Sequence, residues 1–315
     1  MIAYVNGEYV PEEEAKISVF DRGLMFGDAV FDTTRTFDGK PWKLDEHLER
    51  FRRSLRYVEL DGDAIVPEVR EAVDGVVSRS AAEIEALGDV WVTPIVTRGT
   101  MAGLDFDPQP RPTIIVMLRK INFAGFARYY DEGGVDLSIS LTTRHFAGPV
   151  DPRVKATNRL AAVRGELKGR RMAQDDTGSA TRAWTVVFND DGSIAEAHGA
   201  NIAIVTEGRL VRPPRYEALE GVSLETLCDL ARGLGLEVEE RKLTLYDLIN
   251  ADETLIASTS FSVLPVIGID GIKLDAPRAV YSRLLQAWVD FVGFDFVAQA
   301  RERAAAQQLV GAGSR

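Results

Sequence analysis

A lysine in a loop and a glutamate beside an apolar run are the side chains of this sequence best placed for chemistry. Lys155 follows Pro152 in "DPRVKATNRL", directly before a predicted helix, and an amine at such a junction can project into a cleft as a nucleophile. Glu196 lies between the turn "FNDDGSI" and the run "NIAIV", which is typical of a buried strand. An acid that enters a sheet interior needs a partner. Each residue alone is more often a solvated charge, so the assignment depends on other parts of the chain.

The signatures of several common sites are missing. The sequence contains no G-x-G-x-x-G, no G-x-x-x-x-G-K-[ST] and no G-x-S-x-G, so dinucleotide-binding, P-loop and nucleophile-elbow sites lack their motifs. The single cysteine, Cys228, excludes an internal disulfide framework. Three histidines without paired spacing argue against a zinc site, and no metal is expected.

The elements that position Lys155 and Glu196 begin with a small α+β domain. "AYVNGEYV" predicts a hairpin, because Asn6-Gly7 tolerates positive φ between two strand patterns. "LDEHLERFRRSLRYV", from Leu44, has apolar residues at helical spacing and predicts an amphipathic helix. "DVWVTPIVTRG" and "RPTIIVMLRK" predict strands, the second of them central. Together these patterns predict a domain over residues 1–120.

The rest of the chain predicts a larger, sheet-rich domain. Residues 121–134 are aromatic and glycine-bearing, and we expect a linker or a short helix there. A strand "VDLSISL", a helix from about Ala156 to Ala173, and the strands "AWTVVF" and "NIAIV" follow. "GVSLETLCDLARGLGLEVEERKL" predicts a helix and then a strand. We place this domain at residues 135–297 and a helical tail at 298–315.

Composition favours small-molecule chemistry. The 315 residues are 45% hydrophobic and 27% charged, with a net charge of −11, and nucleic acids or acidic membranes require clustered positive charge instead. The first residues have no basic region followed by an apolar block, and no run of about 18 apolar residues occurs. We therefore expect a cytoplasmic protein without a nucleic-acid or membrane partner.

Five short features resemble the class IV aminotransferases, the fold type IV enzymes that use pyridoxal 5'-phosphate (PLP): "HLER" with Arg50, Lys155 before a helix, Glu196 followed by Gly199 and Asn201, "GVS" at 221–223, and "STS" with Thr259. "VFDRGLMFGDAVFDTTR" is similar to the family's "DRG…FGDGVFE" segment, and "LEGVSLETL" is similar to its phosphate loop. The resemblance covers about residues 3–290. It implies an α+β protein with a smaller N-terminal α/β domain and a larger sheet-rich C-terminal domain, and a homodimer.

The resemblance also assigns the cofactor-binding residues. Lys155 matches the lysine that holds PLP covalently and moves the substrate's Cα proton. Glu196 matches the acid that pairs with the protonated pyridine nitrogen. The remaining implied ligands are the backbone N–H groups that start a helix, hydroxyls before a strand, an arginine in "HLER" and the residues after the acid, namely Val222, Ser223, Thr259, Ser260, Arg50, Gly199 and Asn201.

The pattern around the substrate departs from several relatives. D-amino-acid aminotransferases typically carry an Arg and a His that bind the substrate carboxylate where this chain has Gly103 and Asp105. The family as a whole often has a Tyr shortly after the lysine, reaching the cofactor, where this chain has Asn158 and Arg159. "GPVDPRVKATNRLAAVRG" is nearer to the (R)-amine transaminases. The predicted substrate-binding residues are those beside the first motif and two arginines, namely Phe31, Thr33, Arg35 and Arg98.

These resemblances predict a PLP-dependent transaminase. We expect it to move an amino group from a D-amino acid or an (R)-amine to a keto acid by a ping-pong mechanism through Lys155. The alternatives on the same fold are a branched-chain L-amino-acid aminotransferase and aminodeoxychorismate lyase. A protein that kept the fold without catalysis is the alternative from another class.

Overall fold

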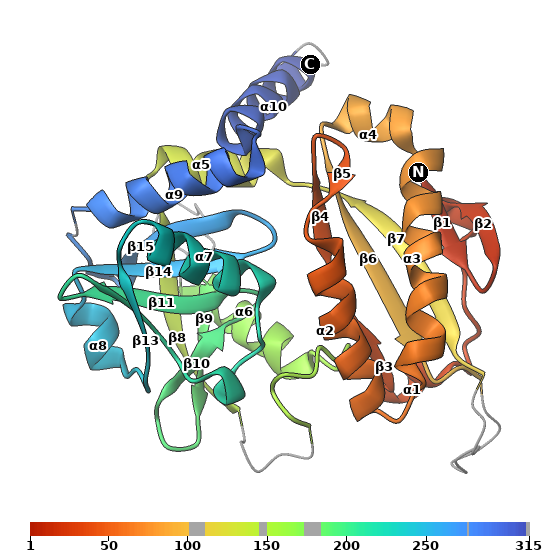
Figure 1. The fold of residues 1–315 in the computed structure, drawn as a ribbon, viewed down its shortest axis with the longest axis horizontal. Helices are drawn as coiled ribbons and strands as arrows, with labels where there is room; N and C mark the ends of the chain where they lie inside the picture. The colour runs from red at the N-terminus through yellow and green to blue at the C-terminus, as the bar shows by residue number, and fades with distance from the viewer. Residues whose placement is uncertain (101–110, 145–149, 173–183, 276, 313–315) are drawn as a thin grey trace. The chain divides into compact units, whose positions relative to one another are not determined.

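A computed structural model of the chain describes residues 1–100, 111–144, 150–172, 184–275 and 277–312 (Figure 1). The chain divides into two compact units, the first made of Met1–Ile121 with Val154–Arg159 and the second of Asn122–Arg153 with Leu160–Arg315. Each unit combines a sheet with helices, which confirms the predicted α+β class. Residues 154–159, predicted in the larger domain, belong to the first unit.

The first unit is built on an antiparallel sheet in the order β2-β1-β7-β6-β4-β5, with β3 also paired to β6. The strands are β1 (Ile2–Val5), β2 (Glu8–Pro11), β3 (Ala29–Phe31), β4 (Thr34–Phe37), β5 (Lys40–Pro41), β6 (Val90–Thr97) and β7 (Thr113–Lys120). The helices are α1 (Arg22–Phe26), α2 (Leu44–Tyr57), α3 (Gly62–Arg79) and α4 (Ala81–Leu87).

Helices α2 and α3 cover one face of this sheet (Figure 1). The predicted amphipathic pattern explains the packing of α2, since Leu48, Phe51 and Leu55 lie within one core cluster with the sheet residues Val92 and Val116. Alternate residues of β3, β4, β6 and β7 therefore point away from these helices, on the opposite face. That second face carries three of the predicted substrate-binding residues, Phe31, Thr33 and Arg35.

The second unit contains a mixed sheet in the order β10-β9-β8-β15-β14-β11-β12-β13, with β16 on β15. Its strands are β8 (Val135–Arg144), β9 (Trp184–Asn189), β10 (Ile194–Ala197), β11 (Asn201–Thr206), β12 (Arg209–Arg212), β13 (Glu237–Glu240), β14 (Glu253–Ser258), β15 (Ser262–Ile269) and β16 (Ile272–Lys273). Its helices are α5 (Phe123–Asp131), α6 (Leu160–Met172), α7 (Val222–Gly233), α8 (Leu245–Asn250), α9 (Ala279–Val292) and α10 (Phe296–Ala312).

The predicted domain boundaries stay a prediction. The segment 121–134 contains helix α5, and the predicted tail 298–315 overlaps α10, which begins two residues earlier. Helix α7 packs on β14 and α9, with its apolar residues Leu224, Leu227 and Ala231 buried. In the described parts of the chain, none of the helices is long and apolar enough to cross a membrane.

Candidate active site

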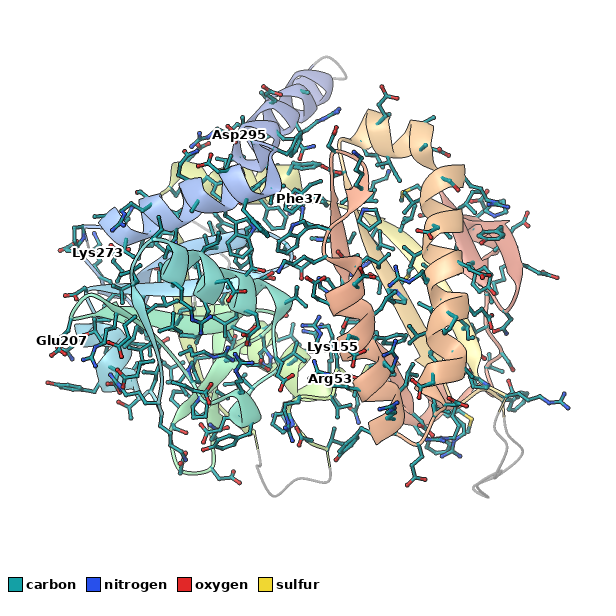
Figure 2. The ribbon with its side chains drawn as sticks, in the orientation of Figure 1. Phe37, Arg53, Lys155, Glu207, Lys273 and Asp295 are labelled. Atoms are coloured by element: carbon teal, nitrogen blue, oxygen red, sulfur yellow. The ribbon has the colours of Figure 1, made fainter. Side chains whose placement is uncertain are left out.

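Lys155 lies in an extended segment that is bonded to β3 and α2. Its carbonyl accepts the Phe31 N–H at 2.9 Å, and the Thr157 N–H donates to the Ala29 carbonyl at 3.0 Å. The Lys155 N–H donates to Ser54 Oγ of α2 at 3.2 Å, and the side chain lies beside that helix (Figure 2). Its Nζ is 4.9 Å from the centroid of the Phe31 ring. The backbone bonds on both sides thus fix where the amine emerges.

The predicted helix start at Ala156 is wrong. Ala156 forms a β-bridge with Val30, and helix α6 begins at Leu160. Pairing with β3 takes up the backbone groups that a helix would have used. The predicted helix end, Ala173, lies outside the described residues.

Arg50 belongs to a buried ion network with Asp32 and His47. Its Nε donates to Asp32 Oδ2 at 2.9 Å and its NH2 group donates to Asp32 Oδ1 at 2.8 Å. His47 Nδ1 lies 2.7 Å from the same Oδ1, and all three residues are at most 5% exposed. Sequence reasoning missed Asp32 and His47. The available signal was the i, i+3 spacing of His47 and Arg50, which puts both on one helix face and requires an acid opposite.

The network shifts the pKa values of both titratable members. Burial alone would raise the pKa of Asp32, but the charges and hydrogen bonds of Arg50 and His47 outweigh it and hold that pKa well below its usual range. Burial lowers the pKa of His47 and outweighs the opposite effect of Asp32. At neutral pH the network therefore contains a carboxylate, a guanidinium and a neutral imidazole.

We predict that His47 makes the protein less stable as the pH falls from 7 to 5. Its pKa is about 6.5 in the unfolded chain and lower in the folded one, so the unfolded state binds the extra proton. Stability is thus present above about pH 6.5 and is lost as pH falls toward the folded pKa. His47→Asn keeps a donor for Asp32 and should flatten this part of the profile in urea unfolding at several pH values. Parallel profiles for both proteins would contradict the prediction.

Phe31, Thr33 and Arg35 lie on the sheet face that α2 and α3 leave uncovered. Phe31 pairs with Ile95 and Arg35 with Trp91, so the register does not change across the gap between β3 and β4. The ladder is interrupted at Pro94, because proline has no N–H to donate. Because successive side chains of a strand point to opposite faces of the sheet, Phe31, Thr33 and Arg35 all lie on one face.

The two arginines predicted to bind a substrate carboxylate are both buried. Arg35 is 2% exposed, its Nε donates to the Thr36 carbonyl, and its Cζ lies 4.2 Å from the Phe37 ring centroid. Its role toward substrate stays a prediction.

Arg98 is 9% exposed and pairs with Asp28 at 2.9 Å, while its NH2 group donates to the Val58 carbonyl. This geometry favours a structural role for Arg98. Gly103 and Asp105 lie outside the described residues.

In the second unit, Glu196 lies on β10 and bonds the chain just before α7. Its Oε2 accepts the Leu219 N–H at 3.1 Å and the Asn201 amide at 3.5 Å, and that amide also donates to the Leu219 carbonyl at 2.9 Å. Gly221 follows in the same loop, where a Cβ would stand 1.8 Å from Asn201 Oδ1. Glu196, Asn201 and the start of α7 are therefore held together, and Gly221 permits the close approach.

The start of α7 is suited to an anion. The helix begins at Val222, and its first N–H groups have no carbonyl one turn earlier to bond. Ser223, in the first turn, is 3% exposed, and its Oγ has no hydrogen-bond partner among the described residues. A buried hydroxyl without a partner beside free N–H groups fits a phosphate at this position.

Thr259 and Ser260 form the turn between β14 and β15. Ser258 Oγ donates to the Gly199 carbonyl at 2.9 Å and accepts the Ser260 N–H at 3.3 Å. Gly199 has φ of +81°, a conformation that favours glycine. The structure thus brings Gly199 next to the turn.

The predicted site residues fall into two groups, one in each unit. The first unit holds Phe31, Thr33, Arg35, Arg50, Arg98 and Lys155, and the second holds Glu196, Gly199, Asn201, Val222, Ser223, Thr259 and Ser260. Within the first, Lys155 and Phe31 are in contact. Within the second, hydrogen bonds join Glu196 to Asn201.

Comparisons with known proteins agree on one family. The family model described as class IV amino-transferase matches residues 29–269. A protein of Methanocaldococcus jannaschii provisionally named a branched-chain-amino-acid aminotransferase is 34% identical over 86% of this chain and 88% of its own length. The D-alanine aminotransferase of Staphylococcus haemolyticus is 27% identical over 90% of this chain and 94% of its own. The structure of the branched-chain amino acid aminotransferase from Escherichia coli is 25% identical, with a TM-score of 0.78 over 91% of this chain and 92% of its own.

Proposed function

The chain belongs to the class IV aminotransferases, and on that premise we propose that it moves an amino group from a D-amino acid or an (R)-amine to a keto acid by a ping-pong mechanism through Lys155. Membership confirms the predicted fold type IV and the use of PLP. The observation that carries the proposal is the position of Lys155, whose segment is bonded to β3 and α2 and whose amine lies against Phe31.

Each unit carries residues whose chemistry suits a part of the cofactor. When bound, PLP supplies an electron sink for the charge that develops at the substrate's Cα. Lys155 would hold its aldehyde carbon, and the start of α7 with the Ser223 hydroxyl would bind the phosphate. Arg50, Thr259 and Ser260 are proposed as further phosphate ligands.

Lys155 is proposed to move the proton. With PLP bound, the freed amine of Lys155 would take the proton from the substrate's Cα and deliver it to the carbon of the cofactor that carried the aldehyde. Glu196 is proposed to keep the ring nitrogen protonated. The hydrogen bonds from Leu219 and Asn201 support this role, because they fix the direction of the carboxylate.

We predict that Glu196→Gln lowers kcat about tenfold or more while PLP stays bound. A neutral amide cannot hold a proton on the ring nitrogen, whereas it can still accept the Leu219 N–H. Single-turnover kinetics would measure the proton-transfer step, and the PLP absorbance would report retention. Glu166→Gln, on α6, is the control and should leave kcat unchanged. A wild-type kcat for Glu196→Gln would contradict the proposed role of Glu196 at the ring nitrogen and would indicate a purely structural role.

A donor panel distinguishes the proposal from its alternatives. D-alanine, L-leucine, (R)-1-phenylethylamine and aminodeoxychorismate are offered separately with one keto-acid acceptor. Transfer from D-alanine or the amine supports the proposal. Transfer from L-leucine alone favours the branched-chain function, a second candidate because of the 34% identical relative. Release of pyruvate from aminodeoxychorismate without transfer favours the lyase.

We also propose a homodimer located in the cytoplasm. The segment from Ile17 to Phe26 exposes several large hydrophobic side chains, among them Val19 at 68% and Phe20 at 64%. Exposed apolar residues gathered in this way are typical of an interaction surface. Sedimentation equilibrium would measure the assembly, and charged substitutions at Val19 and Phe20 would weaken it.

A further inference from the structure

Two arginines outside the predicted site are near each other, and one of them, Arg159, lies close to Lys155. Arg159 follows the lysine by four residues, and its Cζ lies 5.8 Å from the centroid of the same Phe31 ring that the Lys155 amine contacts. Arg119 lies on β7, and its charge and that of Arg159 are near enough to interact. Both arginine side chains are exposed to solvent.

The sheet register places Arg119 on the substrate-facing side of the first unit. Arg119 pairs with Trp91, which pairs in turn with Arg35, so the three residues form one row across β7, β6 and β4. The Arg119 NH2 group donates to Thr93 Oγ1 at 3.2 Å, and Thr93 Oγ1 is 3.2 Å from Thr33 Oγ1. The Arg119 guanidinium therefore extends from the Arg119–Trp91–Arg35 row toward Thr33, on the same face of the sheet.

These two positive charges have no ion-pair partner among the described residues. In the parts of the chain that the structure describes, no carboxylate forms an ion pair with Arg119 or Arg159. Although Arg119 keeps contact with solvent, partial burial of its guanidinium, followed by the charge of Arg159, lowers its pKa. Within the described residues, Arg119 and Arg159 thus keep positive charge without an ion-pair partner in a chain whose net charge is −11, and such a field attracts anions.

We propose that Arg119 and Arg159 together bind a carboxylate of the substrate beside Lys155. This inference rests on the proposed amino transfer and adds two residues that set its substrate class. Two neighbouring guanidinium groups suit a planar carboxylate, because each presents paired N–H donors. The bound anion would also relieve the repulsion between them. The carboxylate is either the one on the reacting carbon or one at the far end of a dicarboxylic acid.

The experiment compares Arg119→Gln, Arg159→Gln and the double variant with the wild-type holoenzyme. Pyruvate and 2-oxoglutarate are titrated by calorimetry without an amino donor, so that binding is measured without turnover. Each single variant should weaken acid binding about 10- to 100-fold, with KM for the acids rising more than kcat falls. The half-reaction with uncharged (R)-1-phenylethylamine should change little. Lys120→Gln, the exposed neighbour of Arg119 on the same strand, loses the same charge and should bind both acids normally.

The pattern of losses identifies the carboxylate. Weaker binding of both acids supports a contact to the carboxylate beside the reacting carbon, and weaker binding of 2-oxoglutarate alone supports a contact to the distal one. Unchanged binding of both acids overturns the inference, and so do equal losses for acids and amine, which would indicate damage to the fold or to cofactor binding. If the wild type transfers no amino group but the variants still bind acids less well, the proposed function fails and the carboxylate site stands.

Discussion

Replacing Lys155 with alanine should lower kcat for amino transfer by about 10²- to 10⁴-fold or more while the fold stays intact. General acid–base catalysis by one positioned side chain contributes about that range, and Lys155 also loses its covalent hold on PLP. The fold should survive because the bonds that fix this segment use backbone groups, from Lys155 to Phe31 and Ser54. The measurements are steady-state kinetics with the preferred donor and the visible absorbance of the cofactor before and after borohydride.

Lys120→Ala is the matched control, since it removes an exposed lysine from the same unit. It should keep wild-type turnover. Far-UV circular dichroism and the urea midpoint of Lys155→Ala should stay close to those of the wild type. Near-normal transamination by a folded Lys155→Ala protein would refute its assignment as the catalytic lysine.

The sequence was sufficient for the elements with strong periodicity. The pattern from Leu44 predicted α2, the run "RPTIIVMLRK" predicted β7, and "GVSLETLCDLARGLG" predicted the helix α7. In each case the local pattern and the tertiary packing agree, so the residues that look apolar are the ones that are buried. The same agreement puts the N–H groups of Val222 and Ser223, which are proposed to bind phosphate, at the start of a helix.

The surroundings of Lys155 could not be predicted in the same way. Residues 154–157 pair with β3, about 125 positions earlier in the chain, and no local pattern encodes a partner at that distance. Arg98 shows the same limit, because only its contacts to Asp28 and Val58 separate a structural arginine from a substrate ligand. Arg119 was missed since its alignment with Trp91 and Thr93 depends on strand register.

Asp32 should be the acid whose loss destabilises the protein most, because it holds two buried partners. Asp32→Asn keeps the shape of the side chain but leaves the Arg50 guanidinium without its counter-ion, at sites only 1% and 5% exposed. Breaking a buried ion pair by removing one member costs about 3–5 kcal/mol. The free energy of unfolding at pH 7, from urea titrations, should fall by that amount. Asp63→Asn provides the comparison: it removes an acid 2.6 Å from Arg56 whose side chain is 62% exposed, and it should leave the free energy of unfolding close to the wild-type value because water screens such surface pairs.

A second variant separates lost charge pairing from lost packing. Adding Arg50→Met to Asp32→Asn removes the unpaired guanidinium, so the double variant should recover part of the stability that Asp32→Asn loses. Recovery is expected because the cost in the single variant comes mostly from a buried charge without a partner. PLP retention should not recover, since Arg50 is proposed to bind the phosphate. A double variant less stable than Asp32→Asn would contradict this expectation. It would mean that the Arg50 side chain stabilises the first unit through its packing more than its unpaired charge destabilises it.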